Sequence, residues 1–124
     1  MEERDPLTQA VIGAAIEVHR EMGPGLLESV YQSCLEHELR LRDVAFERQV
    51  CLPIVYKGAV VADDLVMDVY FPGRLVVELK AVEKLDPIHE AQLLTYVRLS
   101  KTRVGLLINF NVRFLKDGLK RMVL

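Results

Sequence analysis

The stretch AVVADDLVMDVYFPGRLVVELKAV, residues 59–82, decides the fold of this chain. On both sides of Pro72-Gly73, β-branched and apolar residues recur with a period of about two, which is typical of two strands joined by a tight turn. Folding these strands about the turn as an antiparallel pair places Asp68 opposite Glu78. The sequence therefore predicts a hairpin that brings two carboxylates together.

The patterns outside this hairpin predict helices on both sides of it. Upstream, apolar residues recur at three- and four-residue steps, as in helices that bury one face, and one more strand precedes the hairpin. Downstream, helical spacing returns and is followed by a short apolar run suited to a buried strand. The order is α, α, β, β, β, α, β, with a mixed tail over residues 114–124. The elements outside the hairpin cover residues 7–22, 27–41, 50–56, 88–99 and 104–110.

Length and composition bound the class of protein. The 124 residues contain no linker or repeat, so we expect residues 1–124 to form a single α/β or α+β domain with a sheet covered by helices. No segment is long and apolar enough to span a membrane, and the start is acidic, so we expect a soluble cytoplasmic protein. A net charge of −2 gives no overall attraction to a polyanion. The two cysteines, Cys34 and Cys51, are expected to be buried and reduced.

The predicted hairpin has two different faces. Alternate side chains of a strand point the same way, so Glu78 and Lys80 share a face. The opposite face of that strand is apolar and is matched on the preceding strand by Met67, Val69 and Phe71. We therefore expect one face to be core and the other to carry two acids and a lysine.

Two carboxylates that face each other across a strand pair repel and are costly to desolvate, so they call for a cation. Mg²⁺ is suited because it binds one or two carboxylates, keeps several waters and accepts a substrate phosphate. This favours metal-assisted phosphodiester hydrolysis, in which Lys80 orients or helps to deprotonate the attacking water. The alternative is a solvated strand face on which Lys80 forms an ordinary ion pair. Spacing alone leaves both interpretations open.

Two motifs carry a resemblance to a known family. Asp68 followed by Glu78-Leu79-Lys80 resembles the D…(D/E)xK signature of the PD-(D/E)XK nuclease superfamily. Upstream, GLLESVY at residues 25–31 is similar to the motif of the bacterial GxxExxY protein family, which is assigned to that superfamily. The family-like stretches are IGAAIEVHREMGPGLLESVY at 12–31, VVELKAVEKLDPIHEAQLLTYV at 76–97 and VGLLINFNVRFLKDGLKRMVL at 104–124. The resemblance implies a restriction-endonuclease-like core, αβββαβ, with a central mixed sheet flanked by helices.

The resemblance also implies the residues of a site. Asp68 and Glu78 become ligands of Mg²⁺ or Mn²⁺, Lys80 becomes the catalytic lysine, and Glu28 adds a carboxylate to the metal ligands from the early helix. On the late helix, a QxxxY element like that of RecB-like members lies on one helix face and could meet a phosphate or the metal shell. The implied site residues are Glu28, Asp68, Glu78, Lys80, Gln92 and Tyr96.

The early helix gives a further expectation. Glu28 and Tyr31 are three residues apart and so occupy neighbouring positions of one helix face, which we expect to point toward the acidic cluster. The alternative is that Glu28 only stabilises the N-terminus of its helix, where negative charge is favourable.

The function predicted from these features is a metal-dependent nuclease-like hydrolase of nucleic acid, with DNA as the favoured substrate. The alternative is a catalytically silent PD-(D/E)XK-like module that binds nucleic acid or protein. The sequence leaves open DNA against RNA, endonucleolytic against exonucleolytic cleavage, and whether two chains form a homodimer.

Overall fold

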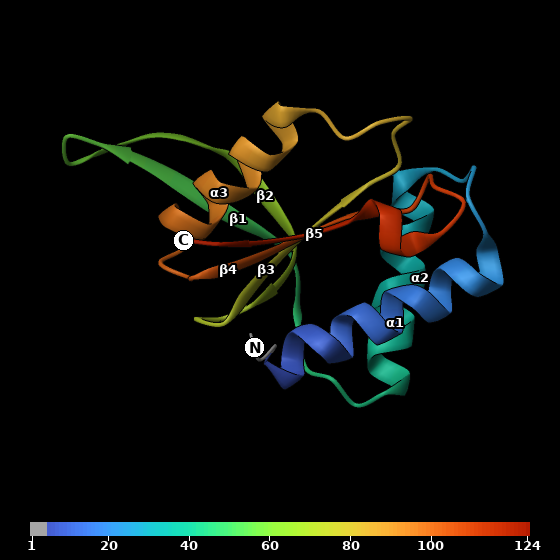
Figure 1. Ribbon diagram of the computed structural model, residues 1–124. Coiled ribbons are helices and arrows are strands. Elements are labelled where there is room, and N and C mark those ends of the chain that lie inside the picture. Colours follow the sequence, from blue (N-terminus) through green and yellow to red (C-terminus); the bar gives the residue numbers. More distant parts are fainter. Residues whose placement is uncertain (1–4) are drawn as a thin grey trace.

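The computed structural model describes residues 5–124, so residues 1–4 of the expected domain, with the acidic start, lie outside the described residues. Helices cover both faces of a central five-stranded sheet (Figure 1). This confirms the predicted α/β architecture and adds a short 3₁₀ helix and a fifth strand in the tail. The elements are α1 Pro6–Met22, α2 Glu28–Leu41, β1 Glu47–Tyr56, β2 Ala59–Phe71, β3 Leu75–Lys80, α3 Pro87–Leu99, β4 Val104–Asn109, η1 Leu115–Gly118 and β5 Leu119–Val123.

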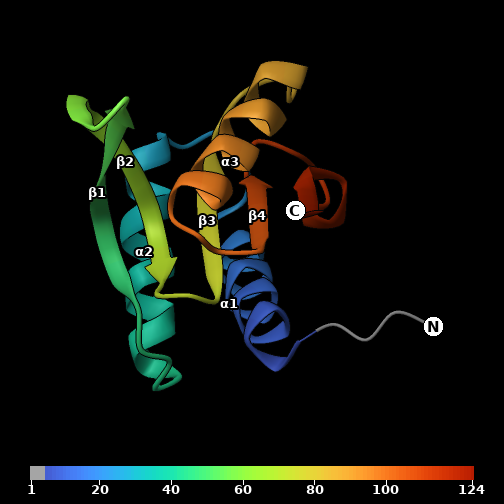
Figure 2. The same ribbon diagram turned by 90° about the vertical axis from the view of Figure 1, so that its left-hand side faces the viewer.

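The sheet is mixed, with strand order β1-β2-β3-β4-β5. Only β3 and β4 pair in parallel, and α3 makes the crossover that such a pair requires. Figure 2 shows α3 on one side of the sheet and α1 and α2 on the other. Gly105 of β4 lies directly under α3, because an added Cβ there would come within 2.8 Å of Leu93 and Val97. This close packing fixes the height of α3 above the sheet.

Both sheet faces bury apolar side chains, which corrects the expectation of a single core face. The face covered by α1 and α2 buries Val69, Leu75, Val77 and Leu79, whereas the face covered by α3 buries Val76. The acid-bearing face is therefore not open to solvent along its length. Its carboxylates lie beside the apolar cluster beneath α3, where that cluster gives way to polar side chains.

Met67 is the one predicted core residue of β2 that lies on the other face. It packs in the cluster beneath α3, whereas Val69 and Phe71 pack toward α1 and α2. The register runs from Val69 with Arg48 to Met67 with Val50, and Gln49 between them has φ of +48°. A left-handed residue changes the local twist, so the alternation of side chains is interrupted at Asp68.

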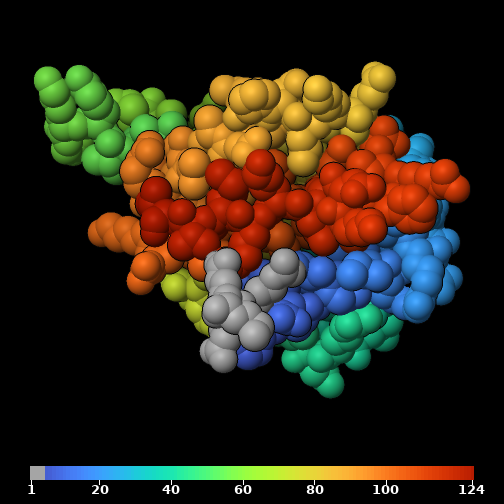
Figure 3. Space-filling model, in the orientation of Figure 1, coloured from blue at the N-terminus to red at the C-terminus, as the bar shows by residue number. Residues whose placement is uncertain are grey.

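The hairpin formed by β1 and β2 extends beyond the body of the protein, as Figure 3 shows. It closes through Lys57 and Gly58, both with positive φ, as the two-residue turn of a twisted hairpin requires. Its exposed apolar residues include Tyr56 and Val60.

Two smaller features complete the comparison with the sequence. Both cysteines are free thiols, as expected, but Cys51 is exposed rather than buried, with its Sγ donating to the carbonyl of Asp63 at 2.8 Å. Within residues 5–124, no helix is long and apolar enough to cross a membrane.

Candidate active site

The strand pair β2–β3 carries the centre of the candidate site. The antiparallel register pairs Phe71 with Leu75 and Val69 with Val77, as the predicted hairpin requires. One step further along, side chains replace the backbone ladder. Glu78 Oε1 accepts a hydrogen bond from the Asp68 amide at 3.1 Å, and Asp68 Oδ2 accepts one from the Leu79 amide at 2.9 Å. The two carboxylates therefore lie together at the point where β2 and β3 diverge.

Glu78 is the more buried of the two acids, with 6% of its surface exposed. Burial, with the neighbouring Asp68 carboxylate as the next cause, raises the pKa of Glu78 from 4.5 to about 9. The Asp68 amide and the ammonium of Lys80 act in the opposite direction without reversing the shift. Without a bound cation, the pair thus holds a proton at neutral pH.

Lys80 and Glu28 approach this pair from two elements. Lys80 ends β3, two residues after Glu78, and its charge lowers the pKa values of both Glu78 and Glu28. Partial burial and the Asp68 carboxylate raise the pKa of Glu28. Glu28 opens α2 and, with Asp68, lines one cavity. The structure therefore brings the early-helix carboxylate to the acidic pair, and its position at a helix N-terminus is a second, compatible property.

The late helix α3 contributes Gln92 and Tyr96 from above the sheet. Tyr96 is buried, and burial followed by the charges of Glu78 and Asp68 raises the pKa of its phenol, while Gln92 acts to lower it. Tyr96 thus faces the acidic pair, and Gln92 lies beside its hydroxyl. All six residues of the predicted site gather around the C-terminal end of β3, and their chemical roles are predictions.

Comparison with known proteins places this geometry in a family. A sequence model of the PD-(D/E)XK nuclease superfamily matches residues 5–122. The chain belongs to the PD-(D/E)XK nuclease superfamily. Searches of curated proteins and of solved structures gave no match.

Members of this superfamily usually bind divalent metals, so the donors must be tested against such an ion. Within residues 5–124, no group of three or more His, Cys, Asp and Glu side chains is arranged as a metal site. Mg²⁺ needs only one or two carboxylates, because it retains several waters. Asp68 and Glu78 offer hard oxygen donors, and burial, followed by the charge of Asp68, raises the pKa of Glu78. This donor set fits Mg²⁺ or Mn²⁺, which would take the place of the proton.

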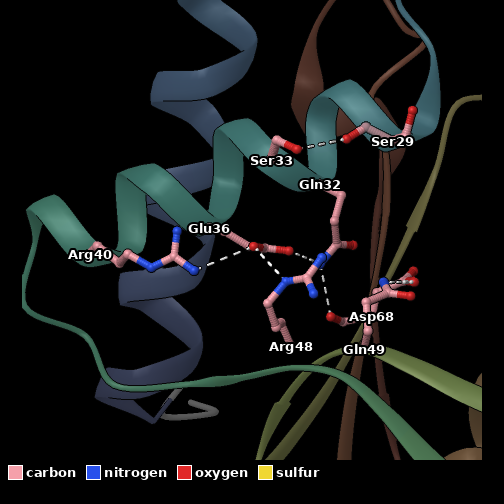
Figure 4. Close-up of polar contacts among 8 residues, drawn as sticks. All are labelled: Ser29, Gln32, Ser33, Glu36, Arg40, Arg48, Gln49 and Asp68. Carbon is pink, nitrogen blue, oxygen red and sulfur yellow. Dashed lines mark hydrogen bonds and ion pairs between the residues drawn. The ribbon is translucent and has the colours of Figure 1, made fainter.

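A polar network behind Asp68 was missed in the sequence (Figure 4). The buried amide of Gln32 donates to the Asp68 carbonyl at 2.9 Å and to Glu36 Oε2 at 2.7 Å. Glu36 also accepts from Arg48 Nε at 2.9 Å, while Gln49 donates to Asp68 Oδ1 at 3.1 Å. These contacts hold β2 against α2 at the level of the acidic pair. The signal that could have revealed part of this network is the four-residue spacing of Glu28, Gln32 and Glu36.

Tyr31, by contrast, does not face the acidic cluster, and that prediction is wrong. Its side chain is fully buried and stacks on Phe110 with ring centres 4.5 Å apart. The hydroxyl donates to the Gly23 carbonyl and accepts from the Leu26 amide. In this structure the motif tyrosine fastens the loop between α1 and α2, which in turn sets where Glu28 begins its helix.

The histidine nearest the site has a structural contact of its own. His89 Nδ1 accepts from the Asp86 amide at 3.0 Å and so closes the capping box of α3. Its charged form would lower the pKa of Glu28, which places the ring within electrostatic reach of the early helix. His19 lies elsewhere and donates from Nε2 to the Val112 carbonyl at 2.7 Å.

Proposed function

We propose that this protein is a metal-dependent nuclease that hydrolyses phosphodiester bonds of nucleic acid, with DNA as the favoured substrate. The observation that carries the proposal is the contact between Asp68 and Glu78 across β2 and β3, with Lys80 two residues further along β3. A chain of this superfamily whose acids are brought together in this way has the donor set for the expected ion. Residues 1–124 are proposed to form one nuclease-like domain.

Within the superfamily, we assign the chain to the GxxExxY proteins. Gly25, Glu28 and Tyr31 supply the three positions of that motif. Each has a distinct role in the structure, since Gly25 has φ of +102° in the loop, Glu28 lies near Asp68, and Tyr31 fastens the loop. These roles support the assignment by explaining why the motif spans a loop and the first turn of a helix.

The proposed mechanism divides the work among the six residues. Asp68 and Glu78 would hold the metal ion, and Glu28 would add a carboxylate near it from the first turn of α2. When bound, Mg²⁺ or Mn²⁺ would supply Lewis-acid stabilisation of the phosphate and would make a nearby water easier to deprotonate. The Lys80 amine would orient the attacking water and accept its proton as the water oxygen bonds to phosphorus, while solvent water protonates the leaving oxygen as its bond to phosphorus breaks. Gln92 and Tyr96 would position the phosphate from α3.

Cleavage assays test this proposal directly. Wild type is incubated with single- and double-stranded DNA and RNA, linear and circular, in Mg²⁺, in Mn²⁺ and in EDTA. We expect cleavage that requires the ion and is abolished, together with ion binding by calorimetry, in Asp68→Asn and Glu78→Gln. Asp117→Asn is the matched control, because Asp117 is an exposed carboxylate of η1.

The outcomes separate the two candidate functions. A wild type that binds nucleic acid but never cuts it with either ion would support the silent binding module instead. Cleavage that persists in both site variants would show that the assigned site is wrong. Light scattering of the same samples with and without DNA reports whether a homodimer forms.

A further inference from the structure

A cavity of about 320 Å³ adjoins the candidate site between the first turns of α2 and the beginning of β1. Asp68 forms the wall that the cavity shares with the acidic pair. The other residues around it all carry polar side chains, and the mechanism proposed above uses only the first: Glu28, Ser29, Gln32, Ser33, Arg48 and Gln49.

Arg48 is the cationic group of this cavity. Its Nε donates to Glu36 at 2.9 Å, and the Glu36 side chain is 7% exposed whereas that of Arg48 is 57% exposed. One edge of the guanidinium is therefore anchored on a buried carboxylate while the rest of it reaches solvent. Figure 4 shows Arg48 between α2 and Asp68. Such an anchored guanidinium has lost part of its freedom before any ligand binds, which lowers the entropy cost of binding an anion.

The charge balance around Arg48 favours an anion as well. The cavity lining carries one positive charge, at Arg48, and two negative charges, at Glu28 and Asp68, so a divalent ion held by these acids would leave the lining with a net positive charge. The acidic end of the cavity, at Asp68 and Glu28, is where the metal ion is proposed to bind. Ser29 and Ser33, on successive turns of α2, add hydroxyl groups to the wall. The lining residues are non-aromatic, so the cavity suits a phosphate rather than a stacked base.

We propose that this cavity binds a backbone phosphate of the nucleic-acid strand beside the one that is cleaved, with Arg48 as its main contact and Ser29 as a hydroxyl donor, since the Ser33 hydroxyl already donates to the Ser29 carbonyl at 3.2 Å. The inference rests on the proposed function, because it places the substrate strand across Asp68. Glu36 is a positioning residue, since it acts on the phosphate only through Arg48.

The test is binding of fluorescent single- and double-stranded DNA oligonucleotides, followed by anisotropy over a range of KCl concentrations. Arg48→Ala is compared with Arg42→Ala, in which an arginine that also pairs through Nε with a glutamate of α2, at 2.7 Å, is removed. In EDTA, each arginine variant is measured in the wild-type background. In Mg²⁺, each is measured in a Lys80→Ala background, which is expected to cleave slowly.

We expect Arg48→Ala to weaken binding about 10- to 100-fold, the range for loss of a hydrogen bond to a charged group. The negative slope of the logarithm of the association constant against log salt should become shallower. The expected change is about 0.9 for duplex and about 0.7 for single strands, the value for one phosphate contact. Arg42→Ala should change neither quantity. Arg48→Lys, which keeps the charge and can still pair with Glu36, should keep the salt slope but lose part of the affinity.

Urea unfolding of each variant identifies a loss of fold, and Arg48→Lys then decides the question in place of Arg48→Ala. Equal binding by Arg48→Ala and Arg42→Ala, or wild-type affinity in Arg48→Lys when the alanine variant is unfolded, would overturn the phosphate site even if wild type cuts DNA. Binding that depends on Arg48 in a protein that never cuts would support the phosphate site and contradict the nuclease. Absence of any binding by wild type would overturn both.

Discussion

Glu78 Oε1 accepts a hydrogen bond from the backbone amide of Asp68, and the Asp68 carboxylate in turn accepts from the amide that follows Glu78. Each acid therefore holds the strand that carries the other. In a regular ladder these amides would bond to carbonyls of the neighbouring strand. Here the divergence of β2 and β3 makes room for carboxylates, and the amides that lost their carbonyl partners are satisfied by them. The same contacts bring together two carboxyl groups, one of them buried, and without a cation one of the two keeps its proton at neutral pH.

The first prediction concerns the pH dependence of stability without metal. Burial and Asp68 raise the pKa of Glu78 from 4.5 to about 9 in the folded protein. Between these values the folded state keeps a proton that the unfolded state has lost, so unfolding releases a proton and stability falls as pH rises. The slope contributed by this one group is at most about 1.4 kcal/mol per pH unit. Urea unfolding in EDTA from pH 5 to pH 9 measures it.

Glu78→Gln is the matched variant, because an amide resembles the protonated acid and cannot titrate. Its stability should lose this pH dependence and exceed that of wild type at pH 9. Added Mg²⁺ should stabilise wild type increasingly as pH rises, since the ion competes with the proton. Parallel pH profiles for wild type and Glu78→Gln in EDTA would contradict the assignment of the titrating group.

The second prediction concerns the network behind Asp68. Gln32→Ala removes the amide that joins Glu36 to the Asp68 carbonyl, and leaves both acceptors short of a donor in a buried setting. We expect a loss of about 1–3 kcal/mol in the free energy of unfolding. Gln9→Ala is the control, since Gln9 is an exposed glutamine of α1, and it should change stability by less than about 0.5 kcal/mol. Equal effects of the two substitutions would show that the network adds nothing measurable.

The hairpin at the centre of the site could be predicted from the sequence because its turn fixes its register. Pro72-Gly73 limits where the chain reverses, and Gly73 has φ of +72°. Once the turn is placed, the positions of Asp68 and Glu78 follow from counting residues. The polar network could not be predicted in this way. It depends on the left-handed conformation of Gln49 and on how α2 lies across β1. Neither feature produces a periodic pattern of residues in the sequence.

Tyr31 shows the limit of helical spacing as evidence. Residues three apart on a helix lie about 60° from each other around the axis. Glu28 and Tyr31 are therefore neighbours on α2. The angle between them is nevertheless large enough that Glu28 lies near Asp68 whereas Tyr31 packs into the main core. Gln32, four residues after Glu28, lies about 40° away on the other side and reaches the site.

The third prediction separates these two roles of the motif. Tyr31→Phe removes the hydroxyl bonds to Gly23 and Leu26 but keeps the ring stacked on Phe110. We expect a loss of about 1 kcal/mol in stability and cleavage rates unchanged under conditions where the variant stays folded. Tyr56→Phe serves as control, because Tyr56 is 62% exposed at the hairpin tip. A large fall in the cleavage rate of folded Tyr31→Phe would show that Tyr31 contributes to the site after all.

The last prediction concerns Lys80, whose role differs from that of the acids. In the proposed mechanism Lys80 is not a ligand of the ion, and its charge favours the ionised forms of both Glu78 and Glu28. Lys80→Ala should therefore still bind Mg²⁺, and more tightly than wild type because a competing cation is gone. Cleavage should nevertheless slow by about 10²–10⁴-fold, the usual contribution of a positioned proton-transfer group. Calorimetric Mg²⁺ titration and single-turnover cleavage of the same protein measure the two effects.

Lys116→Ala provides the comparison for Lys80→Ala, because Lys116 is an exposed lysine of η1 outside the candidate site. It should leave both ion affinity and cleavage rate unchanged. Lys80→Arg then tests the role itself. Arginine keeps the positive charge beside the acids but stays protonated at working pH. If Lys80 acts only through its charge, Lys80→Arg should restore cleavage. If Lys80 transfers a proton, Lys80→Arg should not restore it. If Lys80→Ala loses both Mg²⁺ binding and cleavage, Lys80 organises the metal ligands instead of acting on the water.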